Sequence, residues 1–301
     1  MVTQKFAIIG GDKRNIALAE NILNQGYNLK LFGFTNYDNE AINEKLSKSI
    51  CETIEEVISD ANYIIGGIPC SYNADKLNAP FHNGILYAND LFKLIKPHQI
   101  FVAGYIKPEI LVLAQQHSVH TIDLLQREEL LLYNAIPTAE GALKIAIEET
   151  DITIHDSKTM VIGYGRIGTI LCRILASMGS KVTAVIDTPS KAALATSAGH
   201  KTAHFATEMN NQLHKTDIIF NTVPQILLNE SNMHLIRKNT LIIDLASAPY
   251  GVDSAIGRRL GLKVLLANSL PGKIAPVSAA SYIFETLLKI LEEEATKSCL
   301  H

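Results

Sequence analysis

The sequence has little of what marks a secreted, membrane-spanning or nucleic-acid-binding protein. Its 301 residues include four cysteines and no tryptophan, and the cysteines form no C-x-x-C pair, so neither a disulfide framework nor a zinc site is predicted. No apolar run reaches the roughly 18 residues that a membrane span requires, and the opening residues hold too short an apolar run for a signal peptide. The net charge is −3 and no cluster of lysine and arginine occurs, which disfavours a nucleic-acid partner. We therefore expect a cytoplasmic protein without a membrane or nucleic-acid partner.

The length of the chain and its alternating strand and helix patterns predict a two-domain α/β protein. A chain of 301 residues exceeds what one hydrophobic core usually supports. Strand and helix patterns alternate almost from end to end, which is typical of parallel sheets with helices on both faces. We expect two doubly wound parallel-sheet domains, residues 1–150 for substrate and partner and residues 151–301 for a nucleotide. A helix near 138–149 is predicted to join them, and the last helix, near 279–294, to return toward the domain junction with its apolar face.

The most informative segment is the apolar run that leads into Gly163-Tyr164-Gly165-Arg166-Ile167-Gly168 and then into a helical pattern. A strand, G-x-G-x-x-G and a helix together form the dinucleotide-binding fingerprint of a Rossmann domain. The first glycine permits a tight turn, the second lets the pyrophosphate approach the backbone, and the third lets the helix pack closely on the strand. The pyrophosphate would then accept hydrogen bonds at the helix start, near Arg166 and Ile167.

Asp187 follows the next predicted strand, nineteen residues after Gly168. At this spacing a carboxylate can accept hydrogen bonds from the adenosine ribose. Asp187 favours NAD because a carboxylate would repel the 2′-phosphate of NADP. A register shift of one residue would instead place Ile186 at the ribose and point Asp187 outward.

Three more loops follow predicted strands and are expected at the same edge of the second sheet. The first is Asn221-Thr222-Val223-Pro224, whose backbone and hydroxyl group could line the nicotinamide ribose. The second begins at Asp244 and includes Ala246, and the third runs from 268 to 276. Each of them is also rich in ordinary turn residues.

The opening strand runs into Gly10-Gly11-Asp12-Lys13-Arg14. This segment resembles a degenerate nucleotide loop, but it lacks a third glycine. We favour a substrate role, because basic residues at a helix start suit a carboxylate. Two solvated basic residues on a first helical turn would give the same pattern.

Taken together, these residues resemble the family of dipicolinate synthase A subunits from spore-forming bacteria, over nearly the whole chain. The blocks that carry the resemblance are Ile9-Gly10-Gly11-Asp12-x-Arg14, Arg127-Glu128, Tyr133-Asn134-x-Ile136-Pro137-Thr138-x-Glu140-Gly141, Thr153-Ile154-His155, Asn221-Thr222-x-Pro224, Asp244-Leu245-Ala246-Ser247-x-Pro249-x-Gly251-x-Asp253 and Leu270-Pro271-Gly272-x-x-Ala275-Pro276. The glycine motif is generic, whereas the Ile-Pro-Thr-x-Glu-Gly and Leu-Pro-Gly-x-x-Ala-Pro blocks in this order are specific.

The resemblance implies oxidation of a dihydrodipicolinate-level intermediate of the lysine pathway to pyridine-2,6-dicarboxylate. It also implies a second, flavoprotein-like B subunit of the synthase as partner and, in a sporulating bacterium, a location in the mother cell. A homo-oligomer is expected as well. Family members carry arginine at the tip of the second Rossmann strand, which suits NADP, whereas this chain has Asp187. NAD and NADP therefore both stay open as the cofactor.

A dicarboxylate substrate calls for cations and N–H groups, and an oxidation that forms an aromatic ring calls for at most a modest base. The predicted substrate-binding residues are Gly11, Asp12, Arg14, Arg127, Thr138, Leu270, Pro271 and Gly272, with a helix start expected after Pro137. The predicted acid–base candidates are Glu140, Asp244 and Lys273, while His155 precedes its strand and is interpreted as structural.

Two other classes of function stay open. One is a different two-domain dehydrogenase that acts on a 2-hydroxy or amino acid, for which Lys273 would be the one acid–base group in a strand-end loop. The other is a noncatalytic nucleotide-binding regulatory subunit. The histidine pairs His200/His204 and His117/His120 lack the pattern of a metal site, so no metal is predicted.

Overall fold

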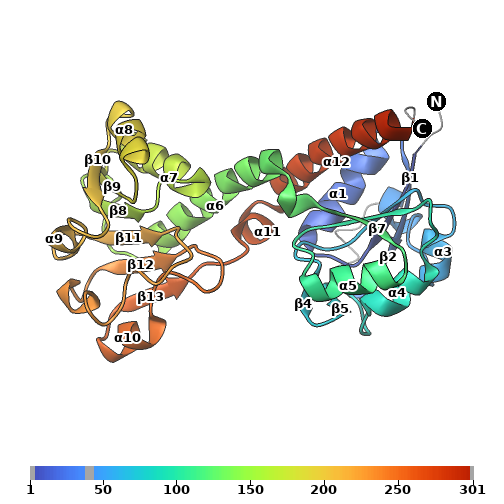
Figure 1. Ribbon diagram of the computed structural model, residues 1–301, viewed down its shortest axis with the longest axis horizontal. Coiled ribbons are helices and arrows are strands. Elements are labelled where there is room, and N and C mark those ends of the chain that lie inside the picture. Colours follow the sequence, from blue (N-terminus) through green and yellow to red (C-terminus); the bar gives the residue numbers. More distant parts are fainter. Residues whose placement is uncertain (1–3, 38–43, 299–301) are drawn as a thin grey trace. The chain divides into compact units, whose positions relative to one another are not determined.

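The computed structural model describes residues 4–37 and 44–298, which form two compact units (Figure 1). The first unit consists of Met1–Tyr133 together with Ala275–His301, and the second of Asn134–Ile274. The expected division at residue 150 differs from this one in two respects. The second unit begins earlier in the sequence, and the last helix belongs to the first unit.

The last helix, α12 (Pro276–Ser298), packs along α1 (Lys13–Asn24). Its buried side chains join one core of the first unit, namely Ile283, Phe284, Leu287 and Ile290. They meet the apolar face of α1, which includes Ile16 and Ile22. Burial of this apolar surface explains why the helix belongs to the first unit.

The first unit contains a parallel sheet of five strands in the order β2-β1-β3-β6-β7. Its strands are β1 (Lys5–Ile9), β2 (Asn28–Phe32), β3 (Tyr63–Ile65), β6 (Ile100–Ala103) and β7 (His120–Asp123). Its other elements are α2 (Glu44–Ser47), α3 (Ile54–Ile58), the hairpin of β4 (Ser71–Asn73) and β5 (Lys76–Leu77), α4 (Ala88–Leu94), α5 (Pro108–Gln116) and a 3-10 turn (Leu124–Gln126). The strand order reverses direction between β1 and β3, which is where doubly wound sheets bind ligands.

The second unit contains a parallel sheet of six strands in the order β10-β9-β8-β11-β12-β13. Its strands are β8 (Lys158–Ile162), β9 (Lys181–Ile186), β10 (Lys201–His204), β11 (Ile218–Asn221), β12 (Leu241–Asp244) and β13 (Lys263–Leu266). Its helices are α7 (Arg166–Ser177), α8 (Pro189–Ser197), α9 (Asn210–Leu213), α10 (Ser254–Arg259) and α11 (Leu270–Ile274), with a 3-10 turn at Met233–Leu235. The order reverses between β8 and β11. The predicted fold class, two doubly wound parallel-sheet domains, is thereby confirmed.

The central strands of the two sheets are buried on both faces, because successive side chains point in opposite directions. In β1, Phe6 and Ile8 join one core and Ala7 joins the core on the other face. In β8, Val161 joins one core of the second unit and Met160 the opposite one. Apolar runs that are buried on both faces in this way are typical of parallel sheets.

The helix α6 (Glu128–Glu148) carries the chain from one unit into the other, and it corrects one expectation. A helix was expected to begin at Thr138, after Pro137. The structure instead has Pro137 inside a helix that begins at Glu128. Proline lacks the N–H that would bond the carbonyl four residues earlier, and that residue, Tyr133, is the last of the first unit's opening segment. The expected anion site at a helix start after Pro137 is therefore wrong.

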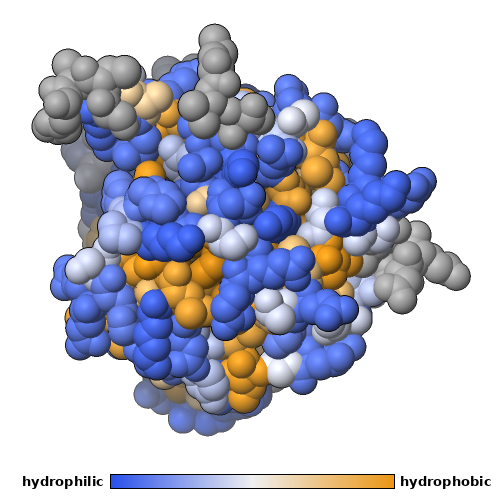
Figure 2. Space-filling model, turned by 90° about the vertical axis from the view of Figure 1, so that its right-hand side faces the viewer, coloured by the Kyte–Doolittle hydropathy of each residue, from blue (hydrophilic) through white to orange (hydrophobic). Residues whose placement is uncertain are grey.

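The surface carries apolar side chains in separate patches. In the face drawn in Figure 2, these patches are interrupted by hydrophilic residues and do not form one continuous apolar surface. Among the helices of the described residues, none has the length and apolar character needed to cross a membrane.

Candidate functional site

The glycine loop of the second unit lies at the reversal point of its sheet, between β8 and α7. Gly163 has a φ of +98°, and a Cβ there would collide with the side chains of Thr222 and Val223. A Cβ on Gly168 would collide with the carbonyl oxygen of Gly163. Both glycines are thus required by the packing of the loop against α7 and the β11 loop.

Gly165 differs from the other two glycines because the packing of the protein does not require it. Its φ of −96° and ψ of −157° suit any residue, and a Cβ built on it would meet no heavy atom within 4 Å. Gly165 is also the N-cap of α7, where it supplies no side-chain hydrogen bond to the first turn. The N–H groups near Arg166 and Ile167 and the positive end of the helix dipole therefore suit an anion such as a pyrophosphate.

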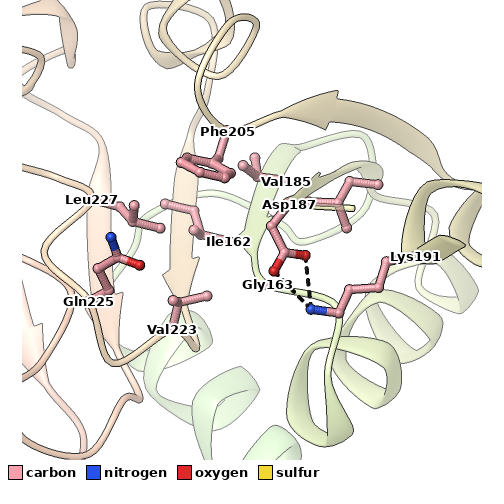
Figure 3. Close-up of a pocket in the computed structure, with 10 residues that line it drawn as sticks. Ile162, Gly163, Val185, Asp187, Lys191, Phe205, Val223, Gln225 and Leu227 are labelled. Carbon is pink, nitrogen blue, oxygen red and sulfur yellow. Dashed lines mark hydrogen bonds and ion pairs between the residues drawn. The ribbon is translucent and has the colours of Figure 1, made fainter. Parts of the chain in front are cut away.

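A pocket opens beside this loop on the side of β9 and β10 (Figure 3). Its walls are largely apolar and come from strand ends and the loops that follow them. The lining side chains include Ile162, Val185, Phe205, Val223 and Leu227, with Asp187 and Lys191 at the rim. An apolar-walled pocket next to a glycine loop of this kind suits the adenine and ribose of a dinucleotide.

Asp187 follows the last residue of β9, and its carboxylate lines this pocket. Lys191, on the first turn of α8, donates to the two carboxylate oxygens over 2.8 Å and 3.1 Å (Figure 3). This hydrogen bond holds the pKa of Asp187 below its usual value, so the carboxylate is ionised at neutral pH. Ile186 also lines the pocket but is only 3% exposed, and the role of Asp187 toward a ribose stays a prediction.

The other predicted cofactor residues follow β11 and β12. Thr222 donates its hydroxyl hydrogen to the carbonyl oxygen of Ile162 over 2.9 Å, which ties the β11 loop to the glycine loop. Val223 lines the pocket beside the glycine loop, and Pro224 is exposed. Asn221 and Ala246 are buried and bond to Asp244.

Asp244 is placed as an anchor of the chain rather than as a free base. It is 2% exposed. Its Oδ1 accepts from the Asn221 side chain and the Ala246 N–H, and its Oδ2 accepts from the N–H groups of Gly251 and Val252, over 2.8–3.1 Å. A carboxylate that accepts four hydrogen bonds has no lone pair left for a substrate proton. The structure therefore does not favour the expected base role for Asp244.

The glycine loop of the first unit is built differently from that of the second. Asp12 is the N-cap of α1 and accepts from the Arg14 N–H over 2.9 Å. Its carboxylate thus occupies the helix N-terminus, where a phosphate would otherwise bind. Gly11 has a φ of +93° and donates its N–H to the carbonyl oxygen of Asn78 over 2.7 Å. These contacts disfavour a nucleotide site here and leave the substrate hypothesis.

Arg14 is 5% exposed, and its guanidinium group lies at the reversal point of the first sheet. Its Nη2 pairs with Asp12 over 2.7 Å and also donates to the carbonyl oxygen of Ile68, in the loop after β3. The guanidinium group that was expected to bind a substrate carboxylate is therefore paired with Asp12 in this structure, and its role toward a substrate stays a prediction.

Arg127 is held within the first unit by two carboxylates. Its Nη1 and Nη2 donate to the two oxygens of Glu293 on α12, each over 2.7 Å, and Nη2 also pairs with Glu129 over 2.7 Å. A forked pair of this kind fixes the position of the guanidinium. The structure thus favours a role in anchoring α12, and substrate binding by Arg127 stays a prediction without support from these contacts.

We predict that Arg127→Ala lowers the free energy of unfolding by about 0.5–1 kcal/mol at pH 7, because both partners are partly exposed. Arg127 lowers the pKa of Glu293 from 4.5. The stabilisation is therefore present above that value and is lost as the pH falls through the lowered pKa. Urea titrations at several pH values measure this stabilisation as a difference in the free energy of unfolding. Lys93→Ala, which removes an exposed i,i+3 pair with Asp90, is the matched control; an effect no larger than the control's would refute the anchoring role.

The remaining predicted residues lie on helices of the second unit. Glu140 is exposed on α6, and Thr138 donates its hydroxyl hydrogen to the Asn134 carbonyl within the same helix. The expected loop at 270–276 contains the helix α11, on which Lys273 is exposed. The other three predicted residues of this segment are two buried ones, Leu270 and Gly272, and the half-buried Pro271. Their roles toward a substrate stay predictions.

Sequence reasoning missed two groups that the structure brings to these sites. Lys191 could have been found, because its i+4 spacing from Asp187 is a standard helical ion-pair spacing. Asn78 could not be found from the sequence, because it follows the hairpin and contacts Gly11 and Pro69 only once the chain has folded.

In the described part of the chain, no group of three His, Cys, Asp or Glu side chains could hold a metal ion. Burial raises the pKa values of Cys70 and Cys172 to about 12, so neither is a thiolate nucleophile at neutral pH.

Comparison with known proteins agrees with the two units. Residues 5–125 match the family model described as the N-terminal domain of the dipicolinate synthase A subunit. Residues 138–261 match the NAD binding domain of the D-isomer specific 2-hydroxyacid dehydrogenases. This second match supports nicotinamide dinucleotide binding and an oxidoreductase fold, and it leaves the choice between NAD and NADP open.

Individual relatives cover nearly the whole chain. The dipicolinate synthase A subunit of Bacillus subtilis (strain 168) is 30% identical over 291 residues, which is 96% of both proteins. The crystal structure of the corresponding Bacillus subtilis protein has a TM-score of 0.85 at 29% identity, over 99% of this chain and 98% of that one. The crystal structure of the Bacillus halodurans counterpart has a TM-score of 0.86 at 26% identity, over 96% and 98%. The chain therefore belongs to the family of dipicolinate synthase A subunits.

Proposed function

We propose that this chain is the oxidoreductase subunit of a dipicolinate synthase. It oxidises a dihydrodipicolinate-level intermediate to pyridine-2,6-dicarboxylate, with NAD or NADP as the hydride acceptor. The observation that carries the proposal is Gly165: the N-terminus of α7 is open to a pyrophosphate at a glycine that the protein's own packing does not need. A member of the family that binds no dinucleotide would have no reason to keep this position free of a side chain. Reduction of the cofactor then distinguishes the oxidoreductase from a nucleotide-binding regulatory subunit.

The chemistry asks little of acid–base groups. One ring C–H bond breaks and its electron pair leaves as hydride, a ring proton is released, and the dihydropyridine becomes aromatic. The bound nicotinamide supplies the hydride acceptor. The tasks of the protein are then to hold the reactants and to exclude water. Glu140 and Lys273 are exposed and stay the candidates for taking up the released proton.

The substrate carries two carboxylates, and the buried Arg14 is the proposed anchor for one of them. It lies at the reversal point of the first sheet, and its guanidinium is held by Asp12 and the Ile68 carbonyl. Such fixed guanidinium groups bind carboxylates with good geometry. Because Asp12 balances the charge of Arg14, we propose that Asp12 limits how tightly the substrate binds.

Arg14→Ala is expected to raise the KM for the substrate by roughly tenfold or more, since a charged hydrogen bond is worth about 1.5–3 kcal/mol. Cofactor affinity should stay unchanged, because the dinucleotide loop belongs to the other unit. Asp12→Asn keeps an N-cap residue on α1 but removes the opposing charge, and it is expected to lower the KM. Steady-state kinetics together with cofactor titration measure both effects. A KM that Arg14→Ala leaves unchanged, in a variant that melts normally, would exclude Arg14 as the anchor.

We further propose that the activity needs the flavoprotein-like B subunit of the synthase and serves sporulation, in the mother cell. The test of the whole function is dipicolinate formation from the enzymatically generated lysine-pathway intermediate. This chain, the flavoprotein-like partner and the nicotinamide cofactor are left out in turn. Loss of product without this chain, and reduction of the cofactor in its presence, support the proposal. An unchanged enzymatic rate without this chain or without the cofactor would replace it with the regulatory interpretation.

A further inference from the structure

Asp244 and Asn221 occupy the last paired positions of two neighbouring strands. β11 ends at Asn221 and β12 ends at Asp244, and these two residues are register partners in the sheet. Asn221 is 0% exposed and donates from Nδ2 to Asp244 Oδ1 over 2.8 Å. The same amide closes the next turn, because Nδ2 also donates to the Val223 carbonyl over 3.0 Å. We call Asn221, Asp244 and Gly251 the strand-end clamp.

Gly251 brings the loop after β12 back onto the loop after β11. Its N–H donates to Asp244 Oδ2 over 2.9 Å, and its carbonyl oxygen accepts from the N–H groups of Leu227 and Leu228 over 3.0 Å and 3.2 Å. A Cβ on Gly251 would collide with the Asn221 amide and the Val223 carbonyl. The carboxylate of Asp244 is thus the shared acceptor that holds both loops in one arrangement.

The β11 loop held by this clamp packs directly on the dinucleotide loop. Thr222 bonds to the carbonyl oxygen of Ile162, and a Cβ on Gly163 would collide with Thr222 and Val223. The pocket that Asp187 lines lies on the β9 side of the reversal point, and Val223 and Leu227 of the β11 loop complete its other wall. A dinucleotide extends across that point, so its other half must lie over the ends of β11 and β12. Those are the two ends that the clamp holds.

We infer that the strand-end clamp positions the nicotinamide half of the cofactor, and that Asp244 acts as its positioning residue and not as a base. The inference rests on the proposed cofactor binding. It predicts that loss of the clamp weakens the binding of the whole dinucleotide and slows hydride transfer. It also predicts a smaller loss of affinity for adenosine diphosphate, because the β11 loop supplies only part of the wall of its proposed pocket.

The test uses Asp244→Asn in the full-length chain. The amide keeps the size of the side chain, but it replaces one acceptor oxygen with an N–H₂ that faces other N–H donors. The expected result is about a tenfold weaker affinity for the preferred dinucleotide, with a smaller loss of affinity for ADP, of about threefold or less. Titration calorimetry measures both ligands. Asn221→Ala, which leaves Asp244 with three N–H donors, should show the same split to a smaller degree.

Two outcomes would overturn the inference. An equal loss of dinucleotide and ADP affinity would show a general structural role, and unchanged affinities would show that the clamp does not reach the cofactor. Should neither variant fold, hydrogen exchange of the wild-type chain decides: the Gly251 and Val252 amides should gain protection with the dinucleotide and not with ADP. A wild-type chain that binds ADP but neither NAD nor NADP would instead refute the proposed function.

Discussion

Gly165→Val is expected to abolish binding of the nicotinamide dinucleotide while the chain still folds. The backbone at Gly165 suits any residue, and a Cβ there would meet no heavy atom of the protein within 4 Å. The variant side chain would instead occupy the space next to the first-turn N–H groups of α7, where the pyrophosphate is proposed to bind. The loss of affinity should exceed about a hundredfold, because the phosphates lose several charge-assisted hydrogen bonds at once.

Calorimetric titration with both NAD and NADP measures this loss, and thermal unfolding measures the fold. Ala176→Val places the same side chain at an exposed position near the other end of α7 and should change neither. Gly168→Ala should instead lower the melting temperature, because its Cβ would collide with the Gly163 carbonyl. Retained cofactor affinity in Gly165→Val would show that the dinucleotide binds elsewhere.

Asp187→Ser is expected to shift cofactor preference from NAD toward NADP by roughly a hundredfold, through two charge effects of about 1–3 kcal/mol each. The first is loss of the repulsion between the Asp187 carboxylate and the 2′-phosphate. The second is release of Lys191, whose ammonium group is bonded to both Asp187 oxygens. Once released, Lys191 can pair with the 2′-phosphate at the rim of the pocket.

The ratio of the two dissociation constants measures this shift, and a second variant separates its causes. Asp187→Ser combined with Lys191→Ala removes the repulsion but supplies no cation, so it should show only the smaller part of the shift. A wild-type chain that binds NAD and NADP equally well would contradict the assignment of Asp187 to the ribose. Preference for NADP in the wild type would mean that Lys191 already prevails over Asp187.

The strands and the dinucleotide loop could be predicted because their signals are local. β1, β3 and β9 are mostly apolar runs that are followed by glycine or by a polar residue. The glycine motif needs only its own spacing and the flanking strand and helix. Likewise, the position of Asp187 followed from the length of one βαβ unit.

The partners of charged side chains could not be predicted, because they come from distant parts of the sequence. Arg127 was expected to bind a carboxylate, and it binds one, but that carboxylate is Glu293 on α12. Asp244 was expected to be a base because carboxylates can act as bases, whereas its four N–H donors are visible only in the fold. The type of a residue indicates what it can do, and its neighbours decide whether it does so.

Pro137 shows a different limit. A proline is favoured in the first turn of a helix and disfavoured inside one, so the sequence favoured a helix start. The structure continues α6 through it. The cost is one missing hydrogen bond, and the helix bears it because it buries Ala135 before the proline and Ala139 and Ala142 after it. The burial of these side chains outweighed the preference of proline for the first turn of a helix. For this reason the helix start expected after Pro137 was wrong.

The path of the chain has a consequence for how the protein is made. The second unit is one continuous segment, Asn134–Ile274, whereas the first needs both ends of the chain. As the ribosome extends the polypeptide, the sheet of the first unit emerges early, but the apolar face of α1 lacks its partner until α12 has been synthesised. Domains usually fold in the order in which they appear. Here the unit whose sheet emerges first stays incomplete, with apolar surface uncovered, until α12 has been added.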